Sequence, residues 1–268
     1  MKKNFMWMMA AILTSGFAVT SCTTNDNPVK QIKDLEVLSI DFESGEAADY
    51  WQWGNGYLVT PELAGSTGQC ASVKSNKDRA DYFFTPVDFT GVVSYTIDFD
   101  IAICGYTGQK NHASFAVMCE NSLEVGCNWG WFYPTPVAPE VKNPSLFNLT
   151  FPGSYKDDEG NVILRKAFVN LTAGLSGQEP ALDENEGTWE YIGDNWYHVK
   201  LTVDVAARTV NYNVKDKTFN TVSLKGTFEL PEGDSPYLTG FYERNNRNNY
   251  DPGAILIDNV KVKVSGIQ

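Results

Sequence analysis

The chain has 268 residues, a formal net charge of −12 at pH 7 and an aromatic content of 13%. A chain this acidic repels nucleic acids and anionic lipid surfaces, so we expect no nucleic-acid partner. The aromatic content excludes disorder over most of the chain, and the length allows one large domain or two small ones.

The first residues predict a removable signal peptide over residues 1–21. Two lysines precede a nearly uncharged apolar stretch at residues 5–19. This stretch is shorter than the about 20 residues that a membrane-spanning helix needs, as is typical of a signal peptide. The segment V-T-S-C at 19–22 resembles the lipobox of bacterial lipoproteins, in which the cysteine is acylated and becomes the N-terminus. The resemblance implies that Cys22 carries lipid. An ordinary secretory signal that contains a cysteine is the alternative.

Residues 22–34 are polar and contain one proline, which predicts a tether between the lipid and a folded domain. Since two or more acyl chains hold a protein firmly to a membrane, we expect the mature chain to be membrane-anchored. No later stretch has the composition of a linker, so residues 35–268 are expected to form a single domain.

Alternating apolar and polar residues predict strands and turns from Leu35 onward, without a strong helix. The clearest alternation lies at residues 91–104. Its expected core-facing set is Val93, Tyr95, Ile97, Phe99, Ile101 and Ile103, and its expected outward set is Ser94, Thr96, Asp98, Asp100, Ala102 and Cys104. Residues 195–216 predict a hairpin, and residues 253–264 predict a long final strand. Weaker strands are expected at 36–43, 70–74, 80–85, 113–119, 146–151, 162–171, 220–228 and 237–243. So many antiparallel strands predict an all-β, two-sheet antiparallel β-sandwich.

The hairpin sequence W-Y-H-V-K-L-T-V-D, followed after a turn by T-V-N-Y-N-V, resembles concanavalin A-like (laminin G-like) jelly rolls. The closing I-L-I-D-N-V-K-V and the opening D-F-E-S-G are also similar to theirs, although galactose-binding-like carbohydrate modules share these two motifs. A lipobox followed by such a sandwich resembles the lipoproteins of polysaccharide-utilisation loci. The resemblance implies an outer-membrane, cell-surface protein that binds polysaccharide beside glycan transporters or enzymes. A glycoside hydrolase or polysaccharide lyase on the same fold, and an adhesion or structural protein, are the alternatives.

Two dense aromatic segments are candidate carbohydrate contacts. They are Y-W-Q-W at 50–53 and N-W-G-W-F-Y at 128–133. Sugar rings pack their C–H faces on aromatic planes, while their hydroxyls need nearby polar groups. The expected contacts are Trp51, Trp53, Trp129, Trp131 and Tyr133. The alternative is that these rings fill the core of the sandwich.

A second candidate contact segment is F-Y-E-R-N-N-R-N-N-Y at 241–250. Its guanidinium and amide groups suit sugar hydroxyls and uronate carboxylates, and we expect contacts from Tyr242, Arg244 and Asn246. A solvated turn is the alternative, because Asn favours turns.

Two aspartates and one tyrosine are candidates for catalysis. Asp98 and Asp100 share one face of a strand, and glycosidases need two neighbouring carboxylates. The D-F-D sequence departs, however, from the E-x-D-x-x-E motif of concanavalin-like hydrolases. Jelly-roll lyases use a Tyr/His pair with Arg and Gln, which Tyr242, Arg244 and either histidine could mimic, but the strand motifs of those lyases are absent. A polar surface without catalysis is the favoured interpretation of the two aspartates.

Acidic residues in the first and last strands of the resembling families often hold a structural calcium, which here points to Glu43 and Asp258. Calcium needs six to eight oxygen ligands, and no cofactor is certain from the sequence. Cys70, Cys104, Cys119 and Cys127 allow three complete disulfide pairings, with buried thiols as the alternative. With only His112 and His198 in the chain, a zinc site or a catalytic triad is not expected.

Overall fold

The computed structural model describes residues 31–43, 51–54, 56–73, 79–83, 87–104, 113–120, 145–151, 165–166, 168–169, 179–180, 182–191, 193–219, 223–245 and 255–267. Every regular element in these ranges is a β-strand, and the strands pair antiparallel in two large sheets and one small one. This confirms the predicted all-β, two-sheet sandwich. The described part of the chain contains no apolar helix of membrane-spanning length. Residues 1–30, with the predicted signal peptide and Cys22, lie outside the described residues.

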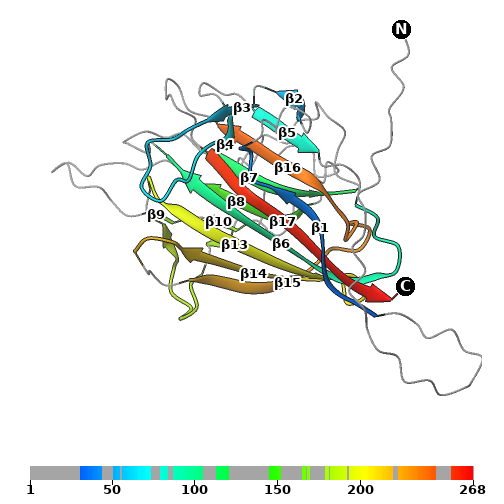
Figure 1. The fold of residues 1–268 in the computed structure, drawn as a ribbon. Helices are drawn as coiled ribbons and strands as arrows, with labels where there is room; N and C mark the ends of the chain where they lie inside the picture. Colours follow the sequence, from blue (N-terminus) through cyan, green and yellow to red (C-terminus); the bar gives the residue numbers. More distant parts are fainter. Residues whose placement is uncertain are drawn as a thin grey trace, which may run out of the picture.

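The first sheet, called sheet A here, has eight strands. In spatial order they are β15 (Leu224–Glu229), β14 (Thr209–Asp216), β13 (Trp196–Asp204), β6 (Val92–Ile103), β17 (Ile255–Ile267), β4 (Cys70–Val73) and β3 (Gly56–Val59), while β1 (Gln31–Ile40) also pairs with β17. The predicted hairpin of β13 and β14 and the predicted final strand β17 are therefore confirmed. Figure 1 shows β1 and β17 side by side, with β6, β13 and β14 following across the sheet.

The second sheet, sheet B, has seven strands behind the first in this view (Figure 1). Its order is β11 (Glu179–Pro180), β10 (Phe168–Val169), β8 (Ser145–Phe151), β7 (Ala113–Cys119), β16 (Leu238–Asn245), β5 (Arg79–Phe83) and β2 (Trp51–Gly54). The short strands β9 (Arg165–Lys166) and β12 (Glu190–Tyr191) form a separate pair.

The core lies between the two sheets, and the alternation of β6 supplies much of it. Tyr95, Ile97, Phe99 and Ile101 are buried as predicted. The ring centroid of Phe99 lies 5.2 Å from that of Phe115 on β7 and 4.9 Å from that of Phe241 on β16. Such tilted aromatic pairs join sheet A to sheet B through non-polar contact.

The predicted faces of β6 are wrong at both of its ends. Val93, expected in the core, is 45% exposed, because a register irregularity leaves it without a partner on β17. Ala102 and Cys104, expected on the polar face, are buried in a second apolar cluster on the outward side of sheet A. The cluster also contains Trp196, whose indole N–H donates to Ser66 Oγ at 3.0 Å. The segment at residues 60–69 thus takes part in burying this end of the sheet. The side chain of Ile103 lies outside the described residues.

Strand β1 begins at Gln31, four residues before the expected start of the domain at Leu35. Gln31 and Ile32 of the predicted tether therefore pair with β17, and Lys33 and Asp34 lie in an irregularity of the register, which the polar sequence did not suggest. Asp34 has a φ of 50°, and its backbone N–H donates to Ser265 Oγ at 3.0 Å. Pairing with a long neighbour stabilises this segment where its own side chains bury little surface.

The cysteines favour the buried-thiol alternative in the described part of the chain. Cys70 and Cys104 are free thiols in the second apolar cluster, and Cys119 is buried in the main core. Burial, together with the nearby charge of Asp194, raises the pKa of Cys104 to about 12. Burial raises the pKa of Cys70 as well, so the thiols of Cys70 and Cys104 are unreactive at neutral pH. Cys127 lies outside the described residues.

Candidate functional site

The predicted carbohydrate contacts are described to different extents. Four of them lie outside the described residues: Trp129, Trp131, Tyr133 and Asn246. One of the two histidines, His112, lies outside them as well. Trp51 and Trp53 lie on β2 and Arg244 lies on β16, and only their backbone positions are described. Tyr242 on β16 is described in full.

Sheet B brings two of the predicted segments into one row. Trp53 on β2 lies opposite Asp81 on β5, and Asp81 lies opposite Tyr242 on β16. The row continues through Ala116 on β7 to Asn148 on β8. The aromatic segment at 50–53 and the polar segment beginning at 241 are thus separated by a single strand, although they are distant in the sequence. We refer to these five register positions as the sheet B row.

Two side chains of the sheet B row turn away from the core. Phe241 packs in the core beside Tyr242, and Leu149 packs there beside Asn148, so strand alternation places Tyr242 and Asn148 on the opposite face. Both side chains are nonetheless buried. Neither polar atom of the Asn148 amide has a hydrogen-bond partner in the described part of the chain. An unsatisfied buried polar group destabilises the folded state by about 1–3 kcal/mol. A ligand hydroxyl or a water that bonded this amide would remove that cost.

Sequence reasoning missed Asn148. A weak signal existed, because Asn148 is the polar residue in the otherwise apolar run Leu146–Leu149. The face on which it lies could not be inferred, since the weaker strand pattern there gave no pairing partner.

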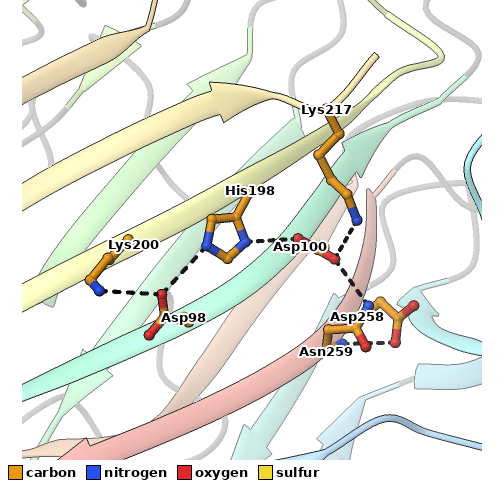
Figure 2. Close-up of polar contacts among 7 residues, drawn as sticks. All are labelled: Asp98, Asp100, His198, Lys200, Lys217, Asp258 and Asn259. Carbon is orange, nitrogen blue, oxygen red and sulfur yellow. Dashed lines mark hydrogen bonds and ion pairs between the residues drawn. The ribbon is translucent and has the colours of Figure 1, made fainter. Parts of the chain in front are cut away.

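The two aspartates considered for catalysis lie on the outward face of sheet A (Figure 2). The register of β13 with β6 places His198 opposite Asp100 and Lys200 opposite Asp98. His198 Nδ1 lies 3.0 Å from Asp100 Oδ1, and His198 Nε2 lies 3.4 Å from Asp98 Oδ1. The imidazole therefore bridges the two carboxylates.

Asp100 is the centre of this polar cluster. Lys217 Nζ donates to Asp100 Oδ2 at 2.7 Å, and Asn259 Nδ2 donates to the same oxygen at 3.0 Å (Figure 2). Lys200 Nζ is 4.0 Å from Asp98 Oδ1. Because Asn259 belongs to β17, the contacts join β13, β6 and β17 across the sheet.

The electrostatics of the cluster fix its charges near neutral pH. Burial acts to raise the pKa of Asp98 and Asp100, but hydrogen bonds from His198 and the charges of the nearby lysines lower both pKa values overall. Hydrogen bonds to Asp100 and then to Asp98 raise the pKa of His198 to about 9. General acid–base catalysis needs a group whose pKa lies near the working pH. This environment therefore favours the polar-surface interpretation of the two aspartates.

Of the two predicted calcium ligands, Glu43 acts electrostatically on Asp258. Burial, and then the charges of Asp100 and Glu43, raise the pKa of Asp258 to about 6. Glu43 Oε1 accepts a hydrogen bond from the backbone N–H of Gln69 at 2.8 Å. Carboxylates are suitable calcium ligands, but two fall short of a full shell. Among the described residues, no group of three or more His, Cys, Asp or Glu side chains is arranged to hold a metal. Calcium stays a prediction.

No family model matches this chain, and no curated protein matches it by sequence. Several solved structures are similar in fold. A lectin from Bauhinia forficata in complex with GalNAc has a TM-score of 0.51 and 10% identity, over 86% of this chain and 99% of that chain. Peanut lectin with a 9mer peptide has a TM-score of 0.49 and 11% identity, over 86% and 98%. The marine PL-14 alginate lyase from Aplysia kurodai has a TM-score of 0.47 and 10% identity, over 85% and 98%.

The likeness to the Bauhinia forficata lectin, together with the two antiparallel sheets, defines a concanavalin A-like sandwich, the fold of legume lectins. At such low identity the comparison establishes the fold alone, since one fold can carry many functions.

Proposed function

We propose that this protein is a surface glycan-binding lipoprotein, anchored to the outer membrane through Cys22, that holds polysaccharide for a glycan-uptake system. The lipobox-like segment at 19–22 supports the anchor, and the lectin-like sandwich supports a carbohydrate ligand. Partner transporters or enzymes would receive the captured glycan. Lectin neighbours were solved with sugars such as galactose and GalNAc, which fits a sugar ligand for this fold.

The observation that carries the proposal is the buried, unsatisfied amide of Asn148 in line with Tyr242. An amide offers both donors and an acceptor, which is the combination that a sugar hydroxyl pairs with. Because Asn148 and Tyr242 are buried, they would form the floor of a covered site. Trp53, at the other end of the sheet B row, would supply an apolar surface for a sugar ring.

Affinity electrophoresis of the purified mature protein in gels containing neutral and acidic polysaccharides tests the proposal. We expect at least one polysaccharide to retard the parent, and we expect Trp53→Ala and Asn148→Ala to weaken the retardation. Ser94→Ala, on the outward face of sheet A, is the matched control and should migrate like the parent. If no polysaccharide retards the parent, or if both variants bind as well as it does, this assignment is wrong.

An enzyme on the same fold is the competing function, and Tyr242 is the catalytic candidate that it retains. It predicts new reducing ends or unsaturated uronate absorbance during incubation with a retarding polysaccharide, lost in Tyr242→Phe. A retained glycan without product release supports binding alone.

A further inference from the structure

The outward face of sheet A carries an ordered row of lysines. Lys261 on β17 lies opposite Asp98 on β6, and Asp98 lies opposite Lys200 on β13. Lys200 lies opposite Asn213 on β14, which in turn lies opposite Lys225 on β15. We call Lys261, Lys200 and Lys225 the lysine row. Alternate strands of one sheet thus place a lysine at the same level.

The lysine row has a regular spacing. Neighbouring strands lie about 4.8 Å apart, so lysines on every second strand are anchored about 10 Å apart. Asp98 and Asn213 occupy the positions between them. A linear ligand that crosses the strands would therefore meet cationic groups at equal intervals.

The side chains of the lysine row are more exposed to solvent than those of the neighbouring aspartates. The Lys200 side chain is 51% exposed, whereas Asp98 and Asp100 are 21% and 6% exposed. Lys261 is exposed as well, and Lys225, which pairs with Glu184, is 45% exposed. His198 and Lys217 lie beside the row, where Asp98 and Asp100 compensate their charges. The lysines of the row are thus more exposed than the aspartates beside them, and Glu184, which is 39% exposed, is the counter-charge of Lys225.

The neighbouring row offers polar groups without apolar ones. Thr96, Thr202, Asn211 and Thr227 lie at one level, next to the lysine row. The exposed large apolar side chains of the described residues are Leu35, Val37, Val93, Leu182 and Phe219. Leu35 and Val37 lie on β1 and Val93 lies near the start of β6, but none of them pairs into the lysine row or the row beside it. A stable protein interface needs an apolar centre, which this part of the face lacks. Hydroxyl and amide groups beside cations instead suit a ligand rich in hydroxyls and anions.

We propose that the lysine row binds a linear anionic glycan, with carboxylate or sulfate groups spaced along an extended chain that lies across the strands of sheet A. This inference rests on the proposed glycan-binding function and adds to it both the charge class of the ligand and a second contact surface. The acidic remainder of the molecule repels a polyanion, which confines it to this face. The exposed pair of Lys200 with Asp98 is weak, so an anionic ligand can displace it.

The test uses the mature protein in native gels that contain polygalacturonate, chondroitin sulfate, or polygalacturonate with its carboxylates reduced to alcohols. We expect both polyanions to retard the parent and the neutral derivative to do so less. In the triple variant Lys200→Gln, Lys225→Gln and Lys261→Gln, the dissociation constant for the polyanions should rise roughly tenfold or more. Replacing the same three residues by Arg keeps the charges and should preserve binding. High salt should weaken binding of the parent, because the charges are exposed.

Equal retardation of the parent and the triple Gln variant would overturn the inference, and so would equal binding of polygalacturonate and its neutral derivative. If a neutral glycan binds through Asn148 while neither polyanion binds, the proposed function stands and this inference fails. If no polysaccharide binds at all, both fail. Vesicles of phosphatidylglycerol provide a further comparison. If they bind the parent through the three lysines and neither polyanion binds, the lysine row contacts a lipid surface, and the proposed glycan ligand is wrong.

Discussion

His198 on β13 lies directly opposite Asp100 on β6, with 3.0 Å between Nδ1 of the imidazole and Oδ1 of the carboxylate. The second ring nitrogen lies 3.4 Å from Asp98 Oδ1. Both ring nitrogens thus face carboxylates, and the arrangement stabilises the protonated imidazole. In the sequence the two aspartates resemble a catalytic pair. In the structure they and His198 form a polar cluster on the surface of the sheet, in which the charges compensate each other.

The first prediction concerns the pH dependence of stability. The contacts with Asp100 and Asp98 raise the pKa of His198 from 6.5 to about 9 in the folded protein. The resulting stabilisation is fully present below pH 6.5 and is lost as the pH rises through about 9. Because the imidazole is 43% exposed, solvent screens the interaction, and we expect a loss of about 1 kcal/mol.

Urea unfolding of the parent and of His198→Gln, at about pH 6 and about pH 9.5, measures this loss. The advantage of the parent over the variant should shrink at the higher pH. Lys200, Lys215 and Lys217 carry charge on the same face, and they remain in both proteins, so their titration is common to the comparison. A pH-independent difference would contradict the assignment.

The second prediction separates the two aspartates by their burial. Asp100 contacts His198, Lys217 and Asn259 and is almost fully buried, whereas Asp98 is more exposed. Removing one partner of a buried pair leaves the other charge uncompensated. We expect Asp100→Ala to lower the free energy of unfolding by about 2–3 kcal/mol and Asp98→Ala by about 1 kcal/mol or less. Equal losses in a denaturant series would show that burial does not set the difference.

Much of the fold could be predicted because its strongest strands carry local signals. The alternation at 91–104 and the hairpin at 195–216 yielded β6, β13 and β14 with their core-facing residues. Pairing between segments that are distant in the sequence has no local signal. An example is β6, which pairs with β13 on one side and with β17 on the other. The bridging role of His198 depends on the pairing of β13 with β6. The sequence therefore indicated Asp98 and Asp100 as neighbours but did not indicate that His198 lies between them.

The same limit explains the remaining differences. Ala102 and Cys104 follow the period of an outward face, but they are covered by Trp196 and the segment at 60–69, which comes from elsewhere in the chain. Short strands such as β3 and β12 have too few residues to show a period at all. Their structure depends on long-range pairing more than on their own composition.

The third prediction concerns Gly68, which has a φ of 117° and lies against the Glu43 carboxylate. A Cβ at this position would lie 1.9 Å from Glu43 Oε1. Gly68→Ala combines backbone strain with displacement of the exposed Glu43 carboxylate from the backbone N–H of Gln69, and we expect a loss of about 1–2 kcal/mol in the free energy of unfolding. Gly233→Ala is the matched control, because its φ is 92° and nothing lies within 4 Å of the added Cβ. The control isolates the backbone cost, about 1 kcal/mol. A Gly68→Ala loss no larger than that of the control would show that Glu43 moves aside freely.

The last prediction tests Asp258 and, with it, the predicted calcium. Burial and neighbouring carboxylates raise the pKa of Asp258 from 3.8 to about 6. A raised carboxyl pKa means that the ionised form destabilises the fold, so this penalty is absent at low pH and complete above about pH 6. Asp258→Asn removes the charge and keeps an oxygen that can accept from the backbone N–H of Asn259. In the presence of a chelator, we expect Asp258→Asn to be more stable than the parent at about pH 8, by about 1 kcal/mol, and to match it at about pH 4.

Calcium enters the same experiment as the second variable. A cation bound between Asp258 and Glu43 would offset the repulsion of the carboxylates and raise the melting temperature of the parent. Glu43→Gln and Asp258→Asn should then lose that rise, while Asp41→Asn, which alters a nearby exposed carboxylate, should keep it. If calcium leaves the melting temperature of the parent unchanged, the two carboxylates hold no calcium. The charge of Asp258 then destabilises the fold without compensation by a cation.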